Sequence, residues 1–224
     1  MAAQGFYKRK GACVMQATGL QYTDNSPYLD NARQKSVFVL SLYSACTIFV
    51  HHLELIVMKE IYFAGGCFWG TEHYFKLVNG VVETEVGYAN GHTDNPTYQQ
   101  VCTDKTGFAE TVRIAYDPEV ISLEFLTEMY FKAIDPTSVN QQGHDKGTQY
   151  RTGIYYTDEA DVPTLQAVYN RVQAEVKLRL AVELLPLKNF YPAEDYHQDY
   201  LDKNPDGYCH LPLELFEMAK RANR

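Results

Sequence analysis

Hydrophobic and polar positions follow a regular pattern from Lys59 onward. Short apolar or alternating runs predict strands over residues 60–64, 81–87, 111–116, 150–156 and 181–187. Apolar residues that recur at steps of three and four predict helices over residues 67–77, 122–134 and 162–176. Turn and capping residues agree with these limits: Asn79-Gly80, Asp117-Pro118, Ser122 and Asp135-Pro136.

The order of these elements indicates the fold. It is strand, helix, strand, strand, helix, strand, followed by one more helix and strand. The first six elements match the split βαβ order of a ferredoxin-like sheet with helices on one face. We therefore predict an α+β fold, an α/β sandwich. Its ferredoxin-like core precedes a long C-terminal coil, because the last part of the chain is rich in Pro, Asn, Asp and Gly.

The first 57 residues differ from the rest. Residues 4–35 are polar and show no sustained period, whereas residues 36–57 are apolar but include two histidines and a glutamate. A membrane span needs about 20 mostly uncharged apolar residues, and a secretory signal lies close to the N-terminus. Three interpretations stay open: an uncleaved leader, a weak membrane anchor, or sequence that is absent from the mature protein.

We favour the third interpretation of this segment. It predicts an N-terminal extension over residues 1–57, poorly ordered or absent from the mature protein, and a folded catalytic domain over residues 58–224. It also predicts a cytoplasmic location, whereas a genuine leader at residues 36–57 would indicate an exported or membrane-anchored protein.

Composition excludes several classes of protein. The formal net charge is -8, and the only basic cluster is Lys8-Arg9-Lys10, so nucleic acid is not expected as a partner. The five cysteines form no CxxC pair, which excludes the usual zinc and thioredoxin-type signatures. No nucleotide-binding fingerprint is present, so we expect no bound cofactor. Most of the cysteines are expected to be small buried residues.

Cys67 has the setting of a reactive thiol. It follows a predicted strand and two glycines, which places it at the first turn of a helix. Free backbone N–H groups and the helix dipole there favour the thiolate, which is the reactive form. Phe68 and Trp69 could form an apolar wall for a small substrate group. In the alternative, Cys67 is simply buried and both aromatic residues are core; position alone leaves the two interpretations even.

Several short blocks resemble the peptide methionine sulfoxide reductase A family, in the same order along the chain. The blocks are Gly66-Cys67-Phe68-Trp69-Gly70, Gly87-Tyr88, Asn95-Pro96-Thr97-Tyr98, Val101-Cys102, Thr106-Gly107-Phe108-Ala109-Glu110, His144-Asp145-Lys146-Gly147-Thr148-Gln149-Tyr150-Arg151, Ala193-Glu194-Asp195-Tyr196-His197-Gln198 and Asn204-Pro205-Asp206-Gly207-Tyr208-Cys209. The resemblance runs from about Lys59 to Cys209. It implies a repair enzyme of the oxidative stress response that reduces methionine sulfoxide, with the S epimer expected.

The resemblance implies roles for a nucleophile and an acid. Cys67 would attack the sulfoxide sulfur, and Glu110 would give a proton to the sulfoxide oxygen. A Glu beside apolar neighbours can keep its proton near neutral pH, because burial disfavours the charged form. Many relatives carry His where this chain has Phe108, which makes the expected site more apolar.

The resemblance also implies a substrate pocket. Tyr98 and Tyr150 would donate hydrogen bonds to the sulfoxide oxygen, and Phe68 and Trp69 would receive the S-methyl group. Asp145 matches a family residue near the substrate backbone or the tyrosines; the equal alternative is an ordinary loop aspartate.

Recycling is implied at the C-terminal coil. Cys67 left as sulfenic acid would condense with Cys209, and thioredoxin, or dithiothreitol in vitro, would reduce the disulfide. The expected partners are thus oxidised proteins or peptides and thioredoxin, with no membrane partner and a monomeric chain. Cys102 is expected to be structural, and Cys13 and Cys46 have no counterpart in the family.

Other readings of the same residues stay open. A binding protein with decayed machinery is one. A cysteine hydrolase that pairs Cys67 with His73, His144 or His197 is another, although a hydrolase has no need of Cys209. A metal site from Cys67, Cys209 and His197 is conceivable by ligand type, but we expect none.

Overall fold

The computed structural model describes residues 57–222. Its strands are β1 (Lys59–Gly65), β2 (Val81–Ala89), β3 (Ala109–Tyr116), β4 (Gln141–Gln142), β5 (Asp145–Lys146), β6 (Thr152–Tyr156), β7 (Glu183–Pro186) and β8 (Phe190–Pro192). Its α-helices are α2 (Phe68–Lys76), α3 (Tyr98–Val101), α4 (Leu123–Ala133), α5 (Val162–Glu175), α6 (Tyr200–Lys203) and α7 (Leu213–Arg221). The predicted extension over residues 1–57 lies outside the described residues, apart from its last residue. In the described part, no helix has the length and apolar character that crossing a membrane requires.

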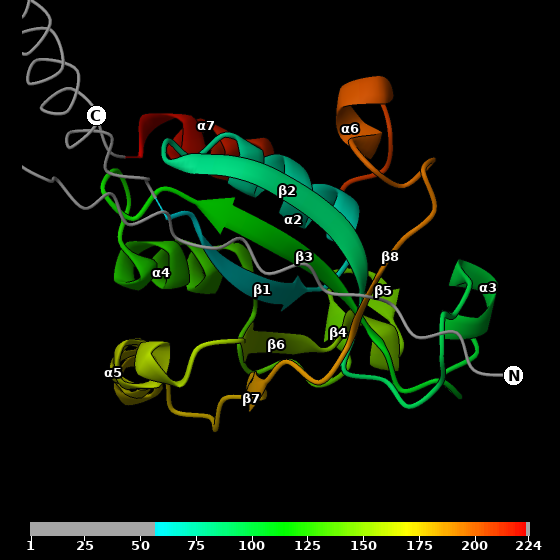
Figure 1. The fold of residues 1–224 in the computed structure, drawn as a ribbon, viewed down its shortest axis with the longest axis horizontal. Helices are drawn as coiled ribbons and strands as arrows, with labels where there is room; N and C mark the ends of the chain where they lie inside the picture. Colours follow the sequence, from blue (N-terminus) through cyan, green and yellow to red (C-terminus); the bar gives the residue numbers. More distant parts are fainter. Residues whose placement is uncertain (1–56, 223–224) are drawn as a thin grey trace, which may run out of the picture. The chain divides into compact units, whose positions relative to one another are not determined.

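Six strands form one sheet in the order β7-β6-β1-β3-β2-β8 (Figure 1). β1 pairs antiparallel with both β3 and β6, and β2 pairs antiparallel with β3. The resulting inner order β6-β1-β3-β2 is that of a ferredoxin-like sheet, so the predicted core is confirmed. β7 extends one edge in parallel and β8 extends the other edge antiparallel.

The two faces of β1 bury different side chains. Ile61 and Phe63 point into the main core, whereas Tyr62 and Ala64 belong to a small cluster on the opposite face. Figure 1 shows α2 and α4 behind the sheet, on the side of the main core. There, the ring of Tyr130 in α4 stacks on Phe63 at 4.7 Å, and its hydroxyl donates to the Ala64 carbonyl. This packing fixes the end of β1, directly before the candidate nucleophile.

The C-terminal region is more regular than the predicted coil. Residues 204–212 hold no helix or strand, but α7 follows directly and packs against α2 and α4. Phe216 and Ala219, three residues apart, supply the buried face of α7. The prediction of a mostly coiled C-terminal part therefore holds for residues 204–212 but missed α7. It weighed the Pro, Asn, Asp and Gly residues before Cys209 and overlooked the amphipathic spacing after Pro212.

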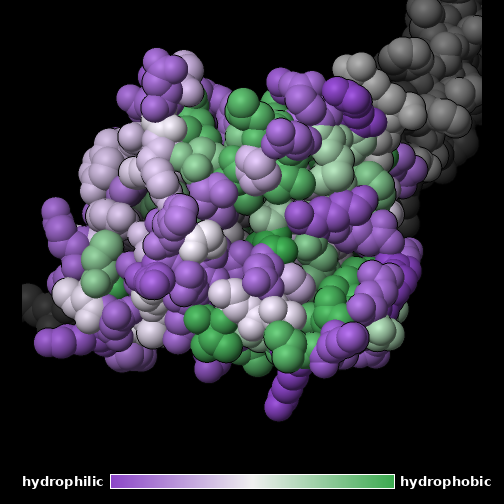
Figure 2. All heavy atoms as spheres, turned by 180° about the vertical axis from the view of Figure 1, so that it is seen from behind, coloured by the Kyte–Doolittle hydropathy of each residue, from purple (hydrophilic) through white to green (hydrophobic). Residues whose placement is uncertain are grey.

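A surface groove lies between α4 and α7. It measures about 670 Å³ and is lined mainly by apolar side chains, among them Phe125, Met129, Leu213 and Met218. Figure 2, which views the molecule from behind, shows apolar residues gathered in patches between polar ones. The groove shares no lining residue with the site described next.

We expect core packing by α4 to dominate stability. Leu126→Ala removes a fully buried side chain and should lower the free energy of unfolding by about 2–5 kcal/mol. The matched control is Leu213→Ala, because Leu213 is 75% exposed. This substitution should change the free energy of unfolding by less than about 0.5 kcal/mol. Urea unfolding of both variants measures the difference, and equal losses would contradict the assigned packing.

Candidate active site

Cys67 lies at the junction of β1 and α2. It is the N-cap residue of α2 and is 6% exposed. Gly66 turns the chain with φ of +85°, and a Cβ there would lie 2.6 Å from the Cβ of Gln142. Only glycine therefore meets both demands at this position. The predicted place of Cys67 after a strand and a glycine turn agrees with the structure.

The protonation state of Cys67 differs from the expectation. Burial raises the pKa of its thiol well above the usual value, and the carboxyls of Glu110 and Asp145 raise it further. The backbone N–H groups of Trp69 and Gly70 lower the pKa, as expected for a helix start, but they are outweighed. The resting side chain is a thiol. The sequence argument counted the helix terminus, which favours the thiolate, and omitted the larger effect of desolvation.

Glu110 is buried beside the start of α2. It is the second residue of β3, is 1% exposed, and accepts a hydrogen bond from the backbone N–H of Phe68 at 3.1 Å. Its Oε1 has no hydrogen-bond partner among the described residues. Burial raises the pKa of Glu110 to about 8, with a smaller rise from Asp145 and an opposing effect of the Phe68 bond. At neutral pH the carboxyl is thus mostly protonated, in the direction that the sequence predicted.

Tyr98 and Tyr150 share an electrostatic environment with Glu110. Tyr98 begins α3, where its backbone N–H donates to Glu194 at 2.9 Å, and Tyr150 ends a short 3-10 helix. Burial raises the pKa of both hydroxyls, and the charge of Glu110 raises it further. Cys67 also raises the pKa of Tyr150. Both tyrosines therefore keep their protons and can act as hydrogen-bond donors near the acid and the thiol.

An aromatic cluster surrounds the first turn of α2. Phe68 is buried, and its ring centroid lies 5.1 Å from that of His197. Trp69 stacks on Tyr200 at 3.7 Å and donates from Nε1 to His197 Nδ1 at 3.0 Å. This bond places any ring proton of His197 on Nε2, a buried atom with no hydrogen-bond partner in the described part of the chain. Sequence reasoning had weighed His197 only as a base or metal ligand; its place in the aromatic cluster was missed.

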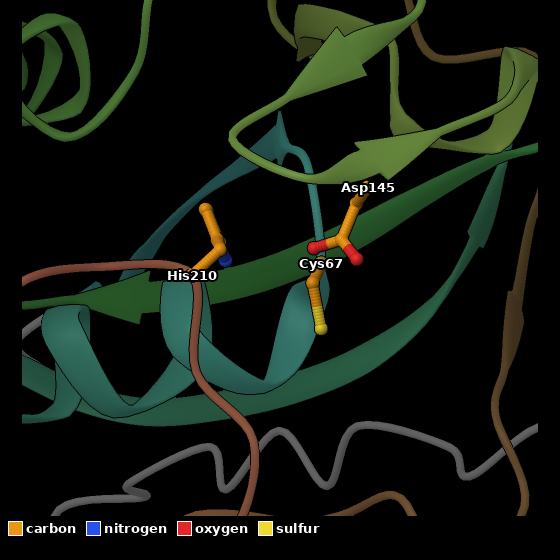
Figure 3. Close-up of side chains that lie close together, drawn as sticks. All are labelled: Cys67, Asp145 and His210. Atoms are coloured by element: carbon orange, nitrogen blue, oxygen red, sulfur yellow. The ribbon is translucent and has the colours of Figure 1, made fainter.

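Asp145 connects the β4–β5 hairpin to the C-terminal segment. Its Oδ1 accepts a hydrogen bond from the Tyr208 hydroxyl at 3.0 Å. Its Oδ2 is buried and finds no hydrogen-bond partner within residues 57–222. A carboxylate oxygen of Asp145, Cys67 Sγ and a ring nitrogen of His210 all lie within 4.8 Å of one another (Figure 3). Asp145 therefore lies beside Cys67, and its role toward a substrate stays a prediction.

Cys209 approaches the same helix turn. A Cβ added at Gly70 would lie 2.9 Å from Cys209 Sγ and 3.2 Å from His210 Nδ1. The three described cysteines are all free. Cys102 is exposed, unlike the small buried residues that most of the cysteines were expected to be, and its expected structural role stays a prediction. His210 was not predicted at all, because its only signal in the sequence is its position next to Cys209.

The histidines considered for a hydrolase are engaged elsewhere. His73 contacts Asp202 at 3.0 Å, His144 is exposed, and His197 is held by the indole. The imidazole near Cys67 belongs to His210. By ligand type, the residues that could hold a metal ion are therefore Cys67, Asp145 and His210. They differ from the set considered from the sequence, and the expectation of no metal stays a prediction.

A family model described as peptide methionine sulfoxide reductase matches residues 59–223. The chain is similar to the peptide methionine sulfoxide reductase MsrA of Clostridium acetobutylicum, with 57% identity over 160 residues, 71% of this chain and 99% of the relative. The protein of the same name from Lachnoclostridium phytofermentans is 54% identical over 164 residues, 73% of this chain and 99% of the relative.

Solved structures give the same picture. Reduced Mxr1 from Saccharomyces cerevisiae superposes with a TM-score of 0.65 and 45% identity, covering 68% of this chain and 88% of that one. Methionine sulfoxide reductase A of Corynebacterium diphtheriae superposes with a TM-score of 0.62 and 39% identity, covering 68% of this chain and 77% of that one. Residues 59–223, which the family model matches, include every residue of the site described above.

Glu110 should make stability depend on pH. An unfolded Glu ionises near 4.5 and the folded one near 8, so the free energy of unfolding should fall as pH rises between these values. Glu110→Gln lacks this proton. The free energy of unfolding of Glu110→Gln minus that of the unchanged chain should therefore rise with pH between 4.5 and about 8, by up to about 1.4 kcal/mol per pH unit.

Urea unfolding in steps from about pH 5 to about pH 9 measures this difference. Glu119→Gln, which changes an exposed carboxyl, is the control and should follow the unchanged chain. A difference between Glu110→Gln and the unchanged chain that is constant over the whole range would disprove the raised pKa.

Proposed function

The chain belongs to the peptide methionine sulfoxide reductase family, and from this premise we propose that it reduces methionine sulfoxide to methionine with Cys67 as the nucleophile. One observation carries the assignment: a buried thiol shares an apolar site with a carboxyl whose pKa is raised to about 8. Oxygen leaves sulfur poorly as an anion and well once protonated. A thiol beside a neutral acid therefore suits this reduction.

In the first step, Cys67 Sγ attacks the sulfoxide sulfur. Attack forms a bond between Sγ and that sulfur. The oxygen then passes to Sγ: the original S–O bond and the new Sγ–S bond break, an Sγ–O bond forms, and Cys67 is left as a sulfenic acid. Glu110 gives its proton to the oxygen, and the thiol proton of Cys67 replaces it. The substrate sulfur gains two electrons, the cysteine sulfur loses two, and methionine leaves.

The pocket residues hold the reacting atoms. Tyr98 and Tyr150 donate hydrogen bonds to the oxygen as negative charge develops there. Phe68 and Trp69 accept the S-methyl group, which supports a small apolar subsite next to the thiol. Asp145 Oδ2, which is buried and has no hydrogen-bond partner among the described residues, accepts a hydrogen bond from the substrate backbone. We expect the S epimer of the sulfoxide as the substrate.

In the second step, the Cys209 thiol attacks the sulfenic acid of Cys67. A disulfide forms and water leaves, and the thiols of thioredoxin then reduce the disulfide. Cys209 lines a surface groove of about 470 Å³ together with Gly207 and Leu211. This groove supports access by a protein reductant from outside. The reductant, a monomeric chain and a cytoplasmic location remain proposals.

A cysteine hydrolase is the second candidate. Cys67, His210 and Asp145 have the residue types of a nucleophile, base and orienting acid, within 4.8 Å of one another. A hydrolase, however, has no use for the protonated Glu110 or for Cys209. The two variants below separate the candidates.

Cys67→Ser should abolish reduction. The unchanged protein, incubated with a peptide that contains methionine sulfoxide and with dithiothreitol, should remove the oxygen, as mass spectrometry of the peptide detects. Cys102→Ser, at an exposed cysteine whose hydrogen bond with Tyr98 a serine can keep, is the matched control and should keep the activity. If folded, fully reduced protein leaves the peptide unchanged, the proposed function is wrong.

Cys209→Ser should separate the two steps. One equivalent of methionine should still form in a single turnover at close to the original rate, because Cys209 acts only afterwards. Repeated turnover with thioredoxin should be lost, because no disulfide can form. Methionine is measured by chromatography in both assays. Unimpaired thioredoxin-linked turnover would contradict the assignment of Cys209 and favour another route.

A further inference from the structure

The imidazole of His210 lies near Cys67 Sγ and approaches the same turn of α2 as Cys209 Sγ. A Cβ at Gly70 would lie 2.9 Å from Cys209 Sγ and 3.2 Å from His210 Nδ1, so both atoms contact the same point of α2. A Cβ at Gly66, the residue before Cys67, would lie 3.4 Å from His210 Nε2. A ring nitrogen of His210 is also within 4.8 Å of Cys67 Sγ. Nδ1 is thus the nitrogen close to Gly70, which Cys209 Sγ also approaches, and Nε2 is the nitrogen close to Gly66, the residue before Cys67.

The ring of His210 has unused hydrogen-bonding capacity. Both nitrogens are buried, and neither makes a well-formed hydrogen bond among residues 57–222. Buried polar atoms are rarely left in this state without a reason. Burial lowers the pKa of His210 against the opposing effects of the Asp145 charge and the Gly65 carbonyl, so the ring is neutral at neutral pH. A neutral imidazole offers one N–H donor and one bare acceptor at the same time.

We propose that His210 moves both protons of disulfide formation. Nδ1 takes the thiol proton of Cys209, while Nε2 gives its proton to the hydroxyl group that leaves the sulfenic acid of Cys67. The Sγ–Sγ bond forms, the S–O bond breaks and water departs. The sulfur of Cys209 is oxidised and the sulfur of Cys67 is reduced. The ring stays neutral and changes tautomer, so no further reagent is needed.

This relay answers two chemical difficulties of the step. Burial raises the pKa of the Cys209 thiol, so its reactive thiolate is scarce at neutral pH. Hydroxide is also a poor leaving group unless it receives a proton. General acid–base catalysis of this kind contributes about 10²–10⁴-fold to a rate. The competing explanation is that His210 is a spacer that packs against Gly66, Gly70 and Gly143.

The inference rests on the proposed function, and His210→Gln tests it. Excess reduced enzyme is mixed rapidly with a methionine sulfoxide peptide, methionine is measured by chromatography, and free thiols are measured by alkylation and mass spectrometry. Methionine should form at the original rate. Disulfide formation should slow by about 100-fold at neutral pH, and the sulfenic acid should accumulate and react with dimedone. His144→Gln, at an exposed imidazole, is the matched control.

The pH dependence separates a relay from a spacer. With the relay, disulfide formation should be nearly constant from about pH 7 to about pH 9. Without it, only the thiolate attacks, and the rate in His210→Gln should rise about tenfold per pH unit below the thiol pKa. A spacer would lower the rate by one constant factor at every pH. That result, an unchanged rate, or equal slowing of both steps would overturn the proposal.

Two further arms keep the test decisive. Circular dichroism checks the fold, and His210→Asn, which retains a polar group near the Nδ1 position, should show the same loss as His210→Gln. Hydrogen peroxide converts the Cys67 thiol to sulfenic acid with release of water, so the resolving step can be followed without any sulfoxide. If the unchanged protein forms no methionine from the sulfoxide peptide, the proposed function alone is wrong. If His210→Gln forms the disulfide after peroxide treatment as fast as the unchanged protein does, the proposal of a proton relay is wrong.

Discussion

Burial of two acidic groups at one point governs the site. Cys67 and Glu110 both lie in apolar surroundings at the start of α2, where the exposed N–H groups of a helix would normally favour anions. Desolvation outweighs this effect for both, raising the pKa of Glu110 from 4.5 to about 8 and that of the Cys67 thiol well above its usual value. The resting site thus holds a thiol and a carboxylic acid.

Two glycines on either side of the nucleophile make this crowding possible. A side chain at Gly66 would collide with Gln142 of the β4–β5 hairpin, which carries Asp145. A side chain at Gly70 would collide with Cys209. Gly66 therefore leaves room for the β4–β5 hairpin, which completes the pocket. Gly70 leaves room for the segment with Cys209, which reacts with the intermediate. The resemblance at residues 66–70 marks the block as functional, and the packing gives each glycine a physical reason.

Local pattern was enough to predict the ferredoxin-like core, because hydrophobic periodicity and capping residues such as Ser122 act within a few positions of one another. The electrostatics of the site could not be predicted in the same way. Phe68 and Glu110 are 42 positions apart, and no spacing reports how much water a fold removes from Cys67. His210 was missed for a related reason, since only the approach of the C-terminal segment to α2 gives it a neighbour to act on.

Residues 204–212 carry Cys209, so this segment must stay near α2 and still let Cys209 reach Cys67. The contacts on either side of the segment explain how both are possible. Before it, Lys76 of α2 forms ion pairs with Asp199 and Asp202, and the Asp199 N–H donates to the buried Glu72. After it, α7 packs on α2 and α4. Between these fixed ends, residues 204–212 have no helix or strand, and they are held by single contacts such as the hydrogen bond from Tyr208 to the Asp145 carboxylate, worth about 1.5–3 kcal/mol. A short shift of Cys209 toward Cys67 therefore costs a few such contacts, while the helices that define the pocket stay in place.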